Sequence, residues 1–382
     1  MSIIETIRSY QDELAAFRQD IHAHPELGLE ETRTAQKVAE KLEEYGIEVH
    51  RGVGRTGVVG VLRGRPGNRA IGLRADMDAL PIEEANDVPY RSTIPGKMHA
   101  CGHDGHTTML LGAAKYLAQT RDFEGTVNFI FQPGEEGCGG ALAMLEDDLF
   151  GRFPCDQVFG MHNRPGLPVG SYAICDGPAM AGGAFFDITV SGYGTHGAQP
   201  QQAKDPVIAA CHIATALQTI VARNVLPAHP AVLSVTKIAG GDAYNVIPNE
   251  ASLGGTARFY SREVGEQLEA RMRKIAESVA EGLGCTATVD WRLIFAPTIN
   301  APEQTATVIA AASDLIGADK VNGQQPPTMG SEDFSFMMEK VPGAYMLVGN
   351  GPGANVHNPT YMFNDEAIPY GAALYARVVE MA

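Results

Sequence analysis

The sequence lacks the features of a membrane or secreted protein. None of its apolar runs is long enough to cross a bilayer. Its beginning, Met1-Ser-Ile-Ile-Glu-Thr-Ile-Arg8, does not have the basic and then apolar layout of a signal peptide. Internal repeats and low-complexity tracts are also absent. We therefore expect a cytoplasmic protein that has no membrane partner.

Basic residues are scarce: 29 lysines and arginines stand against 45 aspartates and glutamates, which gives a net charge of −16 with neutral histidines. Such a surface repels phosphate backbones, so nucleic acid is excluded as an expected partner. Cysteines are equally few, six in 382 residues, and they are scattered along the chain. This spacing does not form a disulfide framework, so we expect free thiols.

The chain is too long for one hydrophobic core, which predicts two domains. A single amphipathic helix is predicted over residues 3–21. Apolar strand-like runs then alternate with helical patterns. The predicted strands of this part are 58–62, 70–75, 127–131 and 158–161. Polar residues follow the strand ends, which indicates an α/β sheet with a site along its carboxyl edge.

The pattern changes near residue 183 and returns to the α/β rhythm after about residue 296. In between, strands and helices are predicted in the order β-α-β-β-α-β, which is typical of a ferredoxin-like unit. We therefore predict an α/β fold with two domains. A discontinuous catalytic domain comprises residues 1–182 and 296–382, and an inserted domain comprises residues 183–295.

Two short segments concentrate potential metal ligands. Met98-His-Ala-Cys-Gly-His-Asp-Gly-His106 contains Cys101 and His103 between glycines, and Gln132-Pro-Gly-Glu-Glu-Gly137 places Glu135 and Glu136 after a strand. His162 ends another predicted strand, and His357 lies in a loop rich in Gly, Asn and Pro. Thiolate, imidazole and carboxylate groups suit a divalent transition metal.

Five candidate ligands exceed the needs of one tetrahedral site, but two ions that share a bridging ligand would use them all. These candidates are Cys101, His103, Glu136, His162 and His357. A metal-bound hydroxide at such a pair suits amide hydrolysis. Glu135 would then act as the general base, and Asp78 would orient a liganding histidine.

Simpler roles remain open for single residues. Any one histidine in a loop is more often a cap or a packing residue than a ligand. His106 is expected to pack at the start of a helix, and His22 and His24 are expected to close the first helix. A closed structural metal site fits poorly, because the ligands are flanked by glycines at a sheet edge.

Five motifs occur in an order that resembles the M20 metallopeptidase clan, and specifically its amidohydrolase branch of hippurate hydrolases, N-acyl-amino-acid amidohydrolases and auxin-conjugate hydrolases. The motifs are His22-Ala-His24-Pro-Glu26-Leu, Arg74-Ala-Asp-Met-Asp78-Ala-Leu-Pro, the Cys101 segment, Phe131-Gln-Pro-Gly-Glu-Glu-Gly and Gly160-Met-His162. The resemblance spans essentially the whole chain. It implies that the five candidate ligands bind two ions, Mn²⁺ or Zn²⁺, and that Glu135 is the general base. Asp76 stands where many relatives carry a metal-binding histidine, so that role is not transferred to it.

The resemblance also implies that the inserted unit is a lid or dimerisation domain, which would give a homodimer or a homotetramer. His196 matches a histidine that stabilises the oxyanion, in several relatives from the partner subunit. Asn245 and Arg258 match substrate-contacting positions, and a guanidinium suits a free α-carboxylate. The simpler alternatives are a turn histidine and a solvated strand arginine. Glu332 or Asp333 could support the site, and the simpler alternative is a helix start that is capped by Ser331.

Together these features predict a hydrolase that cleaves the amide of an N-acyl amino acid, a small molecule, into a carboxylic acid and an amino acid. A dipeptidase or carboxypeptidase on the same dinuclear site is the alternative within the enzyme class. A metal-stabilised binding protein without turnover is the alternative outside it. The acyl group and the choice between manganese and zinc stay open at this point.

Overall fold

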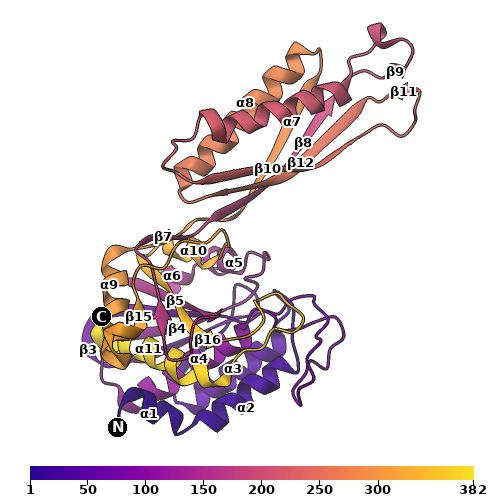
Figure 1. Cartoon of the computed structure of the whole chain (residues 1–382). Coiled ribbons are helices and arrows are strands. Elements are labelled where there is room, and N and C mark those ends of the chain that lie inside the picture. The colour runs from indigo at the N-terminus through magenta and orange to yellow at the C-terminus, as the bar shows by residue number, and fades with distance from the viewer. The chain divides into compact units, whose positions relative to one another are not determined.

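The computed structural model describes residues 1–382, which form two compact units (Figure 1). The larger unit comprises Met1–Ala179, Ile299–Pro327 and Asp333–Ala382, and the smaller unit comprises Met180–Thr298 and Thr328–Glu332. The sequence predicts that segment 328–332 belongs to the catalytic domain. In the structure it packs with the smaller unit, because Ala181 donates its backbone N–H to the carbonyls of Thr328 and Gly330.

An eight-stranded mixed sheet forms the centre of the larger unit, in the order β1-β2-β4-β3-β5-β16-β6-β15. Its strands are β1 Glu48–Val53, β2 Gly57–Arg63, β3 Arg65–Asp76, β4 Glu124–Gln132, β5 Gln157–Pro165, β6 Tyr172–Ala173, β15 Val321–Asn322 and β16 Gly343–Gly351. Strands β4, β3, β5 and β16 are parallel neighbours. They read as nearly continuous apolar runs because helices cover both faces of such a sheet.

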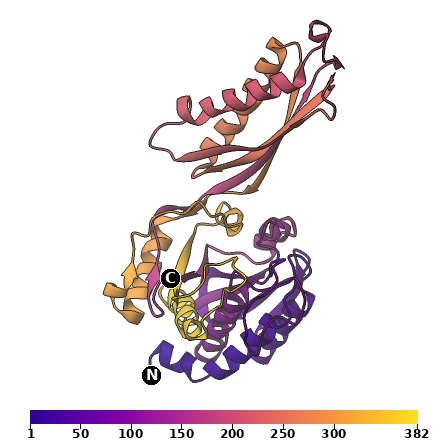
Figure 2. The ribbon, with the colours of Figure 1, turned by 45° about the vertical axis from the view of Figure 1, so that its right-hand side comes forward.

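Helices from distant parts of the chain cover this sheet. They are α1 Ile3–Arg8, α2 Gln11–His22, α3 Thr32–Glu44, α4 His103–Thr120, α5 Gly140–Glu146, α6 Leu149–Arg152, α9 Pro302–Ile316, α10 Phe334–Met338 and α11 Ile368–Met381, with the 3₁₀ turns η2 Ala318–Lys320 and η3 Asp365–Ala367. Helices α1 and α2, from the beginning of the chain, lie beside α11, from its end (Figure 2).

The predicted single helix over residues 3–21 is wrong, because the structure has two helices there. Helix α1 ends at Arg8 and α2 begins at Gln11. At the break, Ser9 donates its hydroxyl to the carbonyl of Thr6 at 2.6 Å, a local contact that competes with the helical hydrogen bonds. Tyr10 then takes a non-helical conformation, with φ −120° and ψ 23°.

The smaller unit contains a four-stranded antiparallel sheet in the order β10-β12-β8-β13. In chain order its elements are β8 Gly182–Ser191, β9 Thr195–His196, η1 Pro200–Gln202, α7 Pro206–Arg223, β10 Ala231–Gly240, β11 Val246–Ile247, β12 Glu250–Phe259, α8 Arg262–Gly282 and β13 Thr286–Phe295. Helices α7 and α8 pack together on one face of the sheet (Figure 1). Their buried faces form a hydrophobic core of their own. Strands β7 Gly177–Met180 and β14 Thr298–Asn300 lie where the chain passes between the units.

Helix α7 corrects the expectation that no run is long enough to cross a bilayer. By length and composition alone, its 18 residues pass that test. The core helix of a soluble protein passes the same test, so one such helix is weak evidence. Here Ala209, Ile213, Leu217 and Ile220 of α7 are buried in the core of the smaller unit.

Candidate metal centre

Four parallel strands of the larger unit determine where the candidate ligands lie. The carboxyl ends of β3, β4, β5 and β16 meet at one edge of the sheet because these strands run in the same direction. Glu135 and Glu136 follow β4, His162 lies in β5, and His357 follows β16. His103 begins α4, and its ring reaches the backbone carbonyl of Asp78, just beyond the carboxyl end of β3.

Gly102, the residue before α4, has a backbone conformation that requires glycine. Gly102 has a φ of +99°, in the left-handed region that other residues rarely adopt. A Cβ at this position would also collide with the side chains of Asn163 and Tyr361. Gly102 therefore lets the chain turn tightly between Cys101 and His103.

The structure brings the five predicted ligands together in two groups. The ligand atoms of Cys101, His103 and His162 all lie within 4.8 Å of one another, and so do those of Cys101, Glu136 and His357. In the first group, Cys101 Sγ lies 3.3 Å from His162 Nε2. In the second, His357 Nε2 lies 3.1 Å from Glu136 Oε1. Cys101 belongs to both groups, so two ions bound here would be neighbours.

Glu135 lies beside these ligands without belonging to either group. Its carboxylate, that of Glu136 and the imidazole of His103 form a third cluster with the same 4.8 Å limit. Glu135 is only 6% exposed. The two adjacent carboxylates thus have different surroundings, because Glu136 also faces His357.

The imidazoles are oriented as metal ligands require. His103 Nδ1 lies 2.9 Å from the backbone carbonyl of Asp78, which can only accept, so Nδ1 carries the proton. His162 Nδ1 likewise donates to the carbonyl of Asn163 at 2.6 Å. In both rings Nε2 is therefore the nitrogen available to an ion, and His103 Nε2 is buried with no hydrogen-bond partner. These residues fit a divalent transition metal.

Asp78 holds two ligand-bearing segments at once. Its Oδ1 accepts from His103 Nδ1 at 3.1 Å, and its Oδ2 accepts from the backbone N–H of Glu136 at 2.9 Å. Asp78 is 1% exposed, so solvent does not compete for these bonds. Carboxylates in this position fix the tautomer and direction of a metal-binding histidine.

Burial and charge set the protonation of the metal-free ligands. Burial raises the pKa of the Cys101 thiol well above its usual range, and the Glu136 carboxylate adds to this. Burial lowers the pKa of His162 well below its usual range. Burial also opposes charge on His103, but the Asp76 carboxylate raises the pKa of that ring well above its usual range. Metal binding must therefore release protons from Cys101 and His103.

His106 and Asp76 form a buried support beneath the ligands rather than part of either group. His106 Nδ1 pairs with Asp76 Oδ1 at 2.6 Å, and its Nε2 lies 2.6 Å from Asn163 Oδ1. Asp76 Oδ2 accepts from Arg74 at 2.9 Å. Burial alone would raise the pKa of Asp76, but His103, His106 and Arg74 hold it well below its usual range.

Asp333 supports the same edge of the sheet, and the expected Ser331 cap is wrong. Helix α10 begins at Phe334, with Asp333 at its N-cap position. The Asp333 carboxylate accepts from Gln132 Nε2 at 2.6 Å and from the backbone N–H of Ala141 at 2.9 Å. It is therefore engaged with the end of β4 and the start of α5. A polar Gln132 at the end of a mostly buried strand is the only sequence signal for this contact.

His196 and Asn245 lie together in the smaller unit, at the paired strands β9 and β11. His196 is the register partner of Val246, and Gly197 donates its backbone N–H to the carbonyl of Asn245 at 2.7 Å. The His196 side chain is exposed, and its Nδ1 accepts from the backbone N–H of Ala198 at 3.1 Å. The neutral ring therefore carries its proton on Nε2.

Arg258 lies at the other end of the small sheet. On β12 it is the register partner of Gly183, whereas Glu250 is the partner of Ser191. The eight strand positions from Glu250 to Arg258 span about 26 Å. Arg258 Nη1 contacts two neutral oxygens, Thr256 Oγ1 at 2.5 Å and the Ala257 carbonyl at 2.9 Å. Burial lowers its pKa. Within one chain, the three predicted substrate-contacting residues are therefore not brought together.

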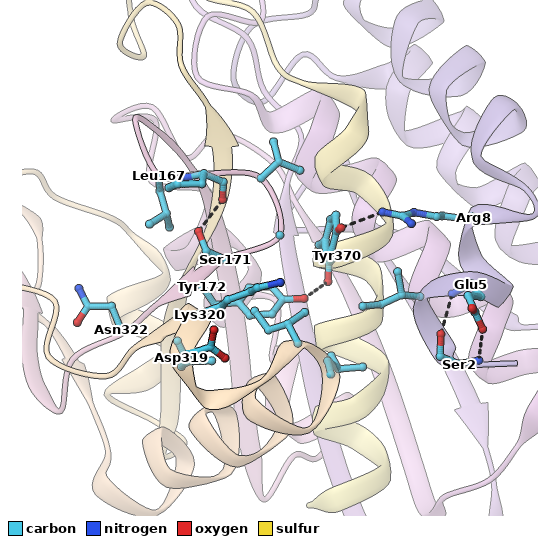
Figure 3. Close-up of a pocket in the computed structure, with 17 residues that line it drawn as sticks. Ser2, Glu5, Arg8, Leu167, Ser171, Tyr172, Asp319, Lys320, Asn322 and Tyr370 are labelled. Atoms are coloured by element: carbon cyan, nitrogen blue, oxygen red, sulfur yellow. Dashed lines mark hydrogen bonds between the residues drawn. The ribbon is translucent and has the colours of Figure 1, made fainter.

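A pocket in the larger unit is lined by residues other than the candidate ligands (Figure 3). Its volume is about 820 Å³, and its lining comes from α1, the loop after β5, β6, the end of α9, η2, β15 and Tyr370 of α11. In it, Arg8 donates to the Tyr370 hydroxyl at 2.8 Å, and Ser2 and Glu5 cap α1. None of the candidate ligands lines it, so this pocket is not part of the metal centre.

Comparison with known proteins agrees with this geometry. The family description "Peptidase family M20/M25/M40" matches residues 72–381. The hippurate hydrolase of Campylobacter jejuni is 42% identical over 378 residues, which cover 99% of this chain and 98% of that protein. The N-acetylcysteine deacetylase of Bacillus subtilis is 37% identical over 376 residues, which cover 97% of each protein. The crystal structure of a Bacillus subtilis protein described as a dinuclear metal-binding peptidase of the M20 family superposes with a TM-score of 0.85, at 34% identity and 98% coverage of both chains.

The mixed α/β sheet and the ligands clustered at its edge define a metal-dependent hydrolase. The chain belongs to peptidase family M20, and within it to the amidohydrolase branch.

Proposed function

We propose that the protein hydrolyses the amide bond of N-acyl amino acids and releases a carboxylic acid and a free amino acid. One observation carries the proposal: a buried carboxylate, Glu135, lies beside two groups of metal ligands without belonging to either. The names of the hippurate hydrolase and the N-acetylcysteine deacetylase both describe enzymes of N-acylated amino acids, which supports this substrate class.

The proposed mechanism assigns separate tasks to two adjacent carboxylates. Two ions, Mn²⁺ or Zn²⁺, would be held by the two groups that share Cys101, and they would supply the Lewis acidity that activates water and polarises the acyl carbonyl. Glu135 accepts the proton of the attacking water and delivers it to the leaving nitrogen. Asp78 keeps His103 and the backbone of Glu136 in place throughout.

Two residues of the smaller unit are proposed to bind the reacting molecule. His196 presents an exposed ring whose Nε2 carries the proton, which suits a donor to the oxyanion. Arg258, half-buried and in contact with neutral oxygens only, suits the free α-carboxylate of the amino acid. Arg258 lies eight strand positions, about 26 Å, from the end of β12 that follows β11 in the chain. We therefore propose that His196 and Asn245 act on the site of a second copy in a homodimer.

Amino-acid release tests the substrate class. The panel comprises N-benzoylglycine, N-acetylcysteine, a long-chain N-acyl amino acid and two Gly-Xaa dipeptides. Chelator-treated protein is assayed alone and after addition of Mn²⁺ or Zn²⁺. Metal-restored turnover on the acyl amino acids supports the proposal. Faster turnover of the dipeptides would replace it with a dipeptidase, and no turnover of any amide would favour a binding protein.

The Glu135→Gln variant tests the proton transfer. The amide keeps the size of the side chain but cannot accept a proton, so turnover is expected to fall by about 10²- to 10⁴-fold. Metal content, measured by elemental analysis, is expected to stay at the wild-type level because Glu135 belongs to neither ligand group. Near-normal turnover of a metal-loaded variant would contradict the role of Glu135.

A further inference from the structure

A cluster of buried charges lies next to the metal centre in the larger unit. It joins Arg18 and His22 of α2, Asp104 of α4, and Glu84 of the segment between β3 and α4, and all four are at most 2% exposed. Arg18 Nη1 lies 3.1 Å from Asp104 Oδ2, and His22 Nδ1 lies 2.9 Å from the same oxygen. His22 Nε2 lies 3.1 Å from Glu84 Oε1. Charges this deeply buried persist only when they are paired.

His22 is the link between the two carboxylates of this cluster. It was expected to close the first helix, and it is indeed the last residue of α2, but its ring points into the interior. Burial opposes its charge, yet the hydrogen bonds to Asp104 and Glu84 raise the pKa of His22 to about 9. The ring is therefore protonated on both nitrogens. Its Nδ1 donates to Asp104, and its Nε2 donates to Glu84.

Glu84 connects the cluster to the loop that follows it. Its Oε2 accepts from the backbone N–H of Ser92 at 2.7 Å, and its Oε1 accepts from Asn86 Nδ2 at 3.1 Å. The same loop then reaches the segment after His357. Ala85 donates its N–H to the Pro359 carbonyl at 2.9 Å, and Asn86 Nδ2 donates to the Tyr361 carbonyl at 2.9 Å.

His357 needs such support more than the other ligands do. Its side chain is 51% exposed, whereas His103 is fully buried. Its φ of +65° lies in the left-handed region, which is unfavourable for a histidine. Besides its pairing with Glu136, it has one fixed contact, a hydrogen bond from its backbone N–H to the Ala100 carbonyl at 2.7 Å. The surrounding loops must therefore hold this conformation.

We propose that His22 and Glu84 are positioning residues that hold the loop of His357 at the metal centre. The proposal rests on the dinuclear centre of the proposed function, but neither residue touches a ligand. Removing either side chain is expected to lower the affinity for the ion held by Cys101, Glu136 and His357. The affinity for the ion held by Cys101, His103 and His162 is expected to stay unchanged.

Metal titration of chelator-stripped protein with Zn²⁺ tests this selectivity without any measurement of turnover. The wild type is expected to bind two equivalents. Glu84→Gln and His22→Gln are expected to bind the first equivalent with wild-type affinity and the second about 10- to 100-fold more weakly, as is usual when support of a ligand is lost. His357→Ala is expected to show the same pattern, and Glu84→Gln added to His357→Ala is expected to have no further effect.

Glu13→Gln is the matched control. Glu13 of α2 pairs with Lys115 of α4 at 2.6 Å, so it joins the same two helices as His22 and Asp104. It makes no contact with the Glu84 loop. Its loss is expected to leave both metal equivalents unchanged, which separates positioning of His357 from general loosening of the helices.

Asn86→Ser covers the case in which the buried variants do not fold. It removes only the hydrogen bond to the Tyr361 carbonyl and the longer contact with Glu84. The affinity for the second metal equivalent is expected to fall by a few-fold. Equal loss of both equivalents, an unchanged second equivalent, or a wild type with one equivalent would each overturn the proposal. A wild type that binds two ions but cleaves no acyl amino acid would instead contradict only the proposed function.

Discussion

The larger and the smaller unit present their functional residues in opposite ways. In the larger unit, Cys101, His103 and Glu135 are all nearly buried, and ligand atoms from distant parts of the chain lie within 4.8 Å of one another. In the smaller unit, His196 is exposed at one end of the sheet and Arg258 lies at the other. Parallel strands deliver their carboxyl ends to one edge, whereas antiparallel neighbours deliver theirs to opposite edges. The larger unit is therefore built to assemble a site, and the smaller unit to supply separate contacts.

The largest effect should come from His103→Ala, which tests whether the buried centre acts as one unit. The ligand atom of His103 lies within 4.8 Å of those of Cys101 and His162 and of those of Glu135 and Glu136. Its loss should therefore disturb the binding of both ions. Turnover is expected to fall by roughly 10³-fold or more, with loss of most bound metal, because the ions supply the Lewis acidity. Elemental analysis and an assay on N-benzoylglycine measure both effects.

The control is His24→Ala in the same unit, where the ring contacts only the backbone carbonyl and the carboxylate of Asp20 in α2. This variant is expected to keep its metal and its turnover. Two retained equivalents in His103→Ala would show that the ligands act independently, and the contrast between the two units would be lost.

His196→Ala probes the smaller unit and should leave the metal untouched. Removal of one donor to an oxyanion lowers kcat by about 10²- to 10³-fold, and metal content is expected to be that of the wild type. His212→Ala, an exposed histidine of α7, is the matched control and is expected to keep full turnover. Loss of metal in His196→Ala would mean that the two units are not separate in function.

Mixing two inactive variants shows in which copy His196 acts. A mixed dimer of Glu135→Gln and His196→Ala contains one site with intact Glu135 and the intact His196 of the partner subunit. Recovery of turnover after mixing supports action across the dimer. No recovery, with mixed dimers demonstrated by mass spectrometry, would place His196 in the site of its own chain.

The ligands could be predicted from the sequence because they cluster in short motifs and follow recognisable strands. Cys101 and His103 lie two residues apart, and Glu136 follows the apolar run of β4. The supports could not be predicted in the same way. Arg18 and Asp104 are 86 residues apart, and no periodic pattern marks their pairing. Likewise, the left-handed φ of His357 depends on contacts with Ala100 and the Glu84 loop, which only the folded chain creates.

The smallest predicted effect is a difference between the two units in how their stability depends on pH. Burial opposes charge on His22, but Asp104 and Glu84 raise its pKa from 6.5 to about 9. Because the pKa of His22 is raised in the folded state, its contribution to the stability of the larger unit is complete below pH 6.5. This contribution is lost as the pH rises through about 9. The shift corresponds to roughly 3 kcal/mol at most. The three histidines of the smaller unit, His196, His212 and His229, are all exposed, so this unit should not share the dependence.

A single tryptophan makes this comparison measurable, because Trp291 of β13 lies in the smaller unit. Urea unfolding is followed by Trp291 fluorescence and by hydrogen exchange of α2 and α4, at pH values from 6.5 to about 9. Chelator is present throughout, since metal binding has its own pH dependence. The amides of α2 and α4 are expected to lose protection as the pH rises, and the Trp291 transition is expected to move less. His22→Gln should flatten the dependence in α2 and α4, because it removes the titrating group and leaves the other ionisable ligands in place. Equal shifts for both probes, unaffected by His22→Gln, would mean that the buried charges do not distinguish the two units.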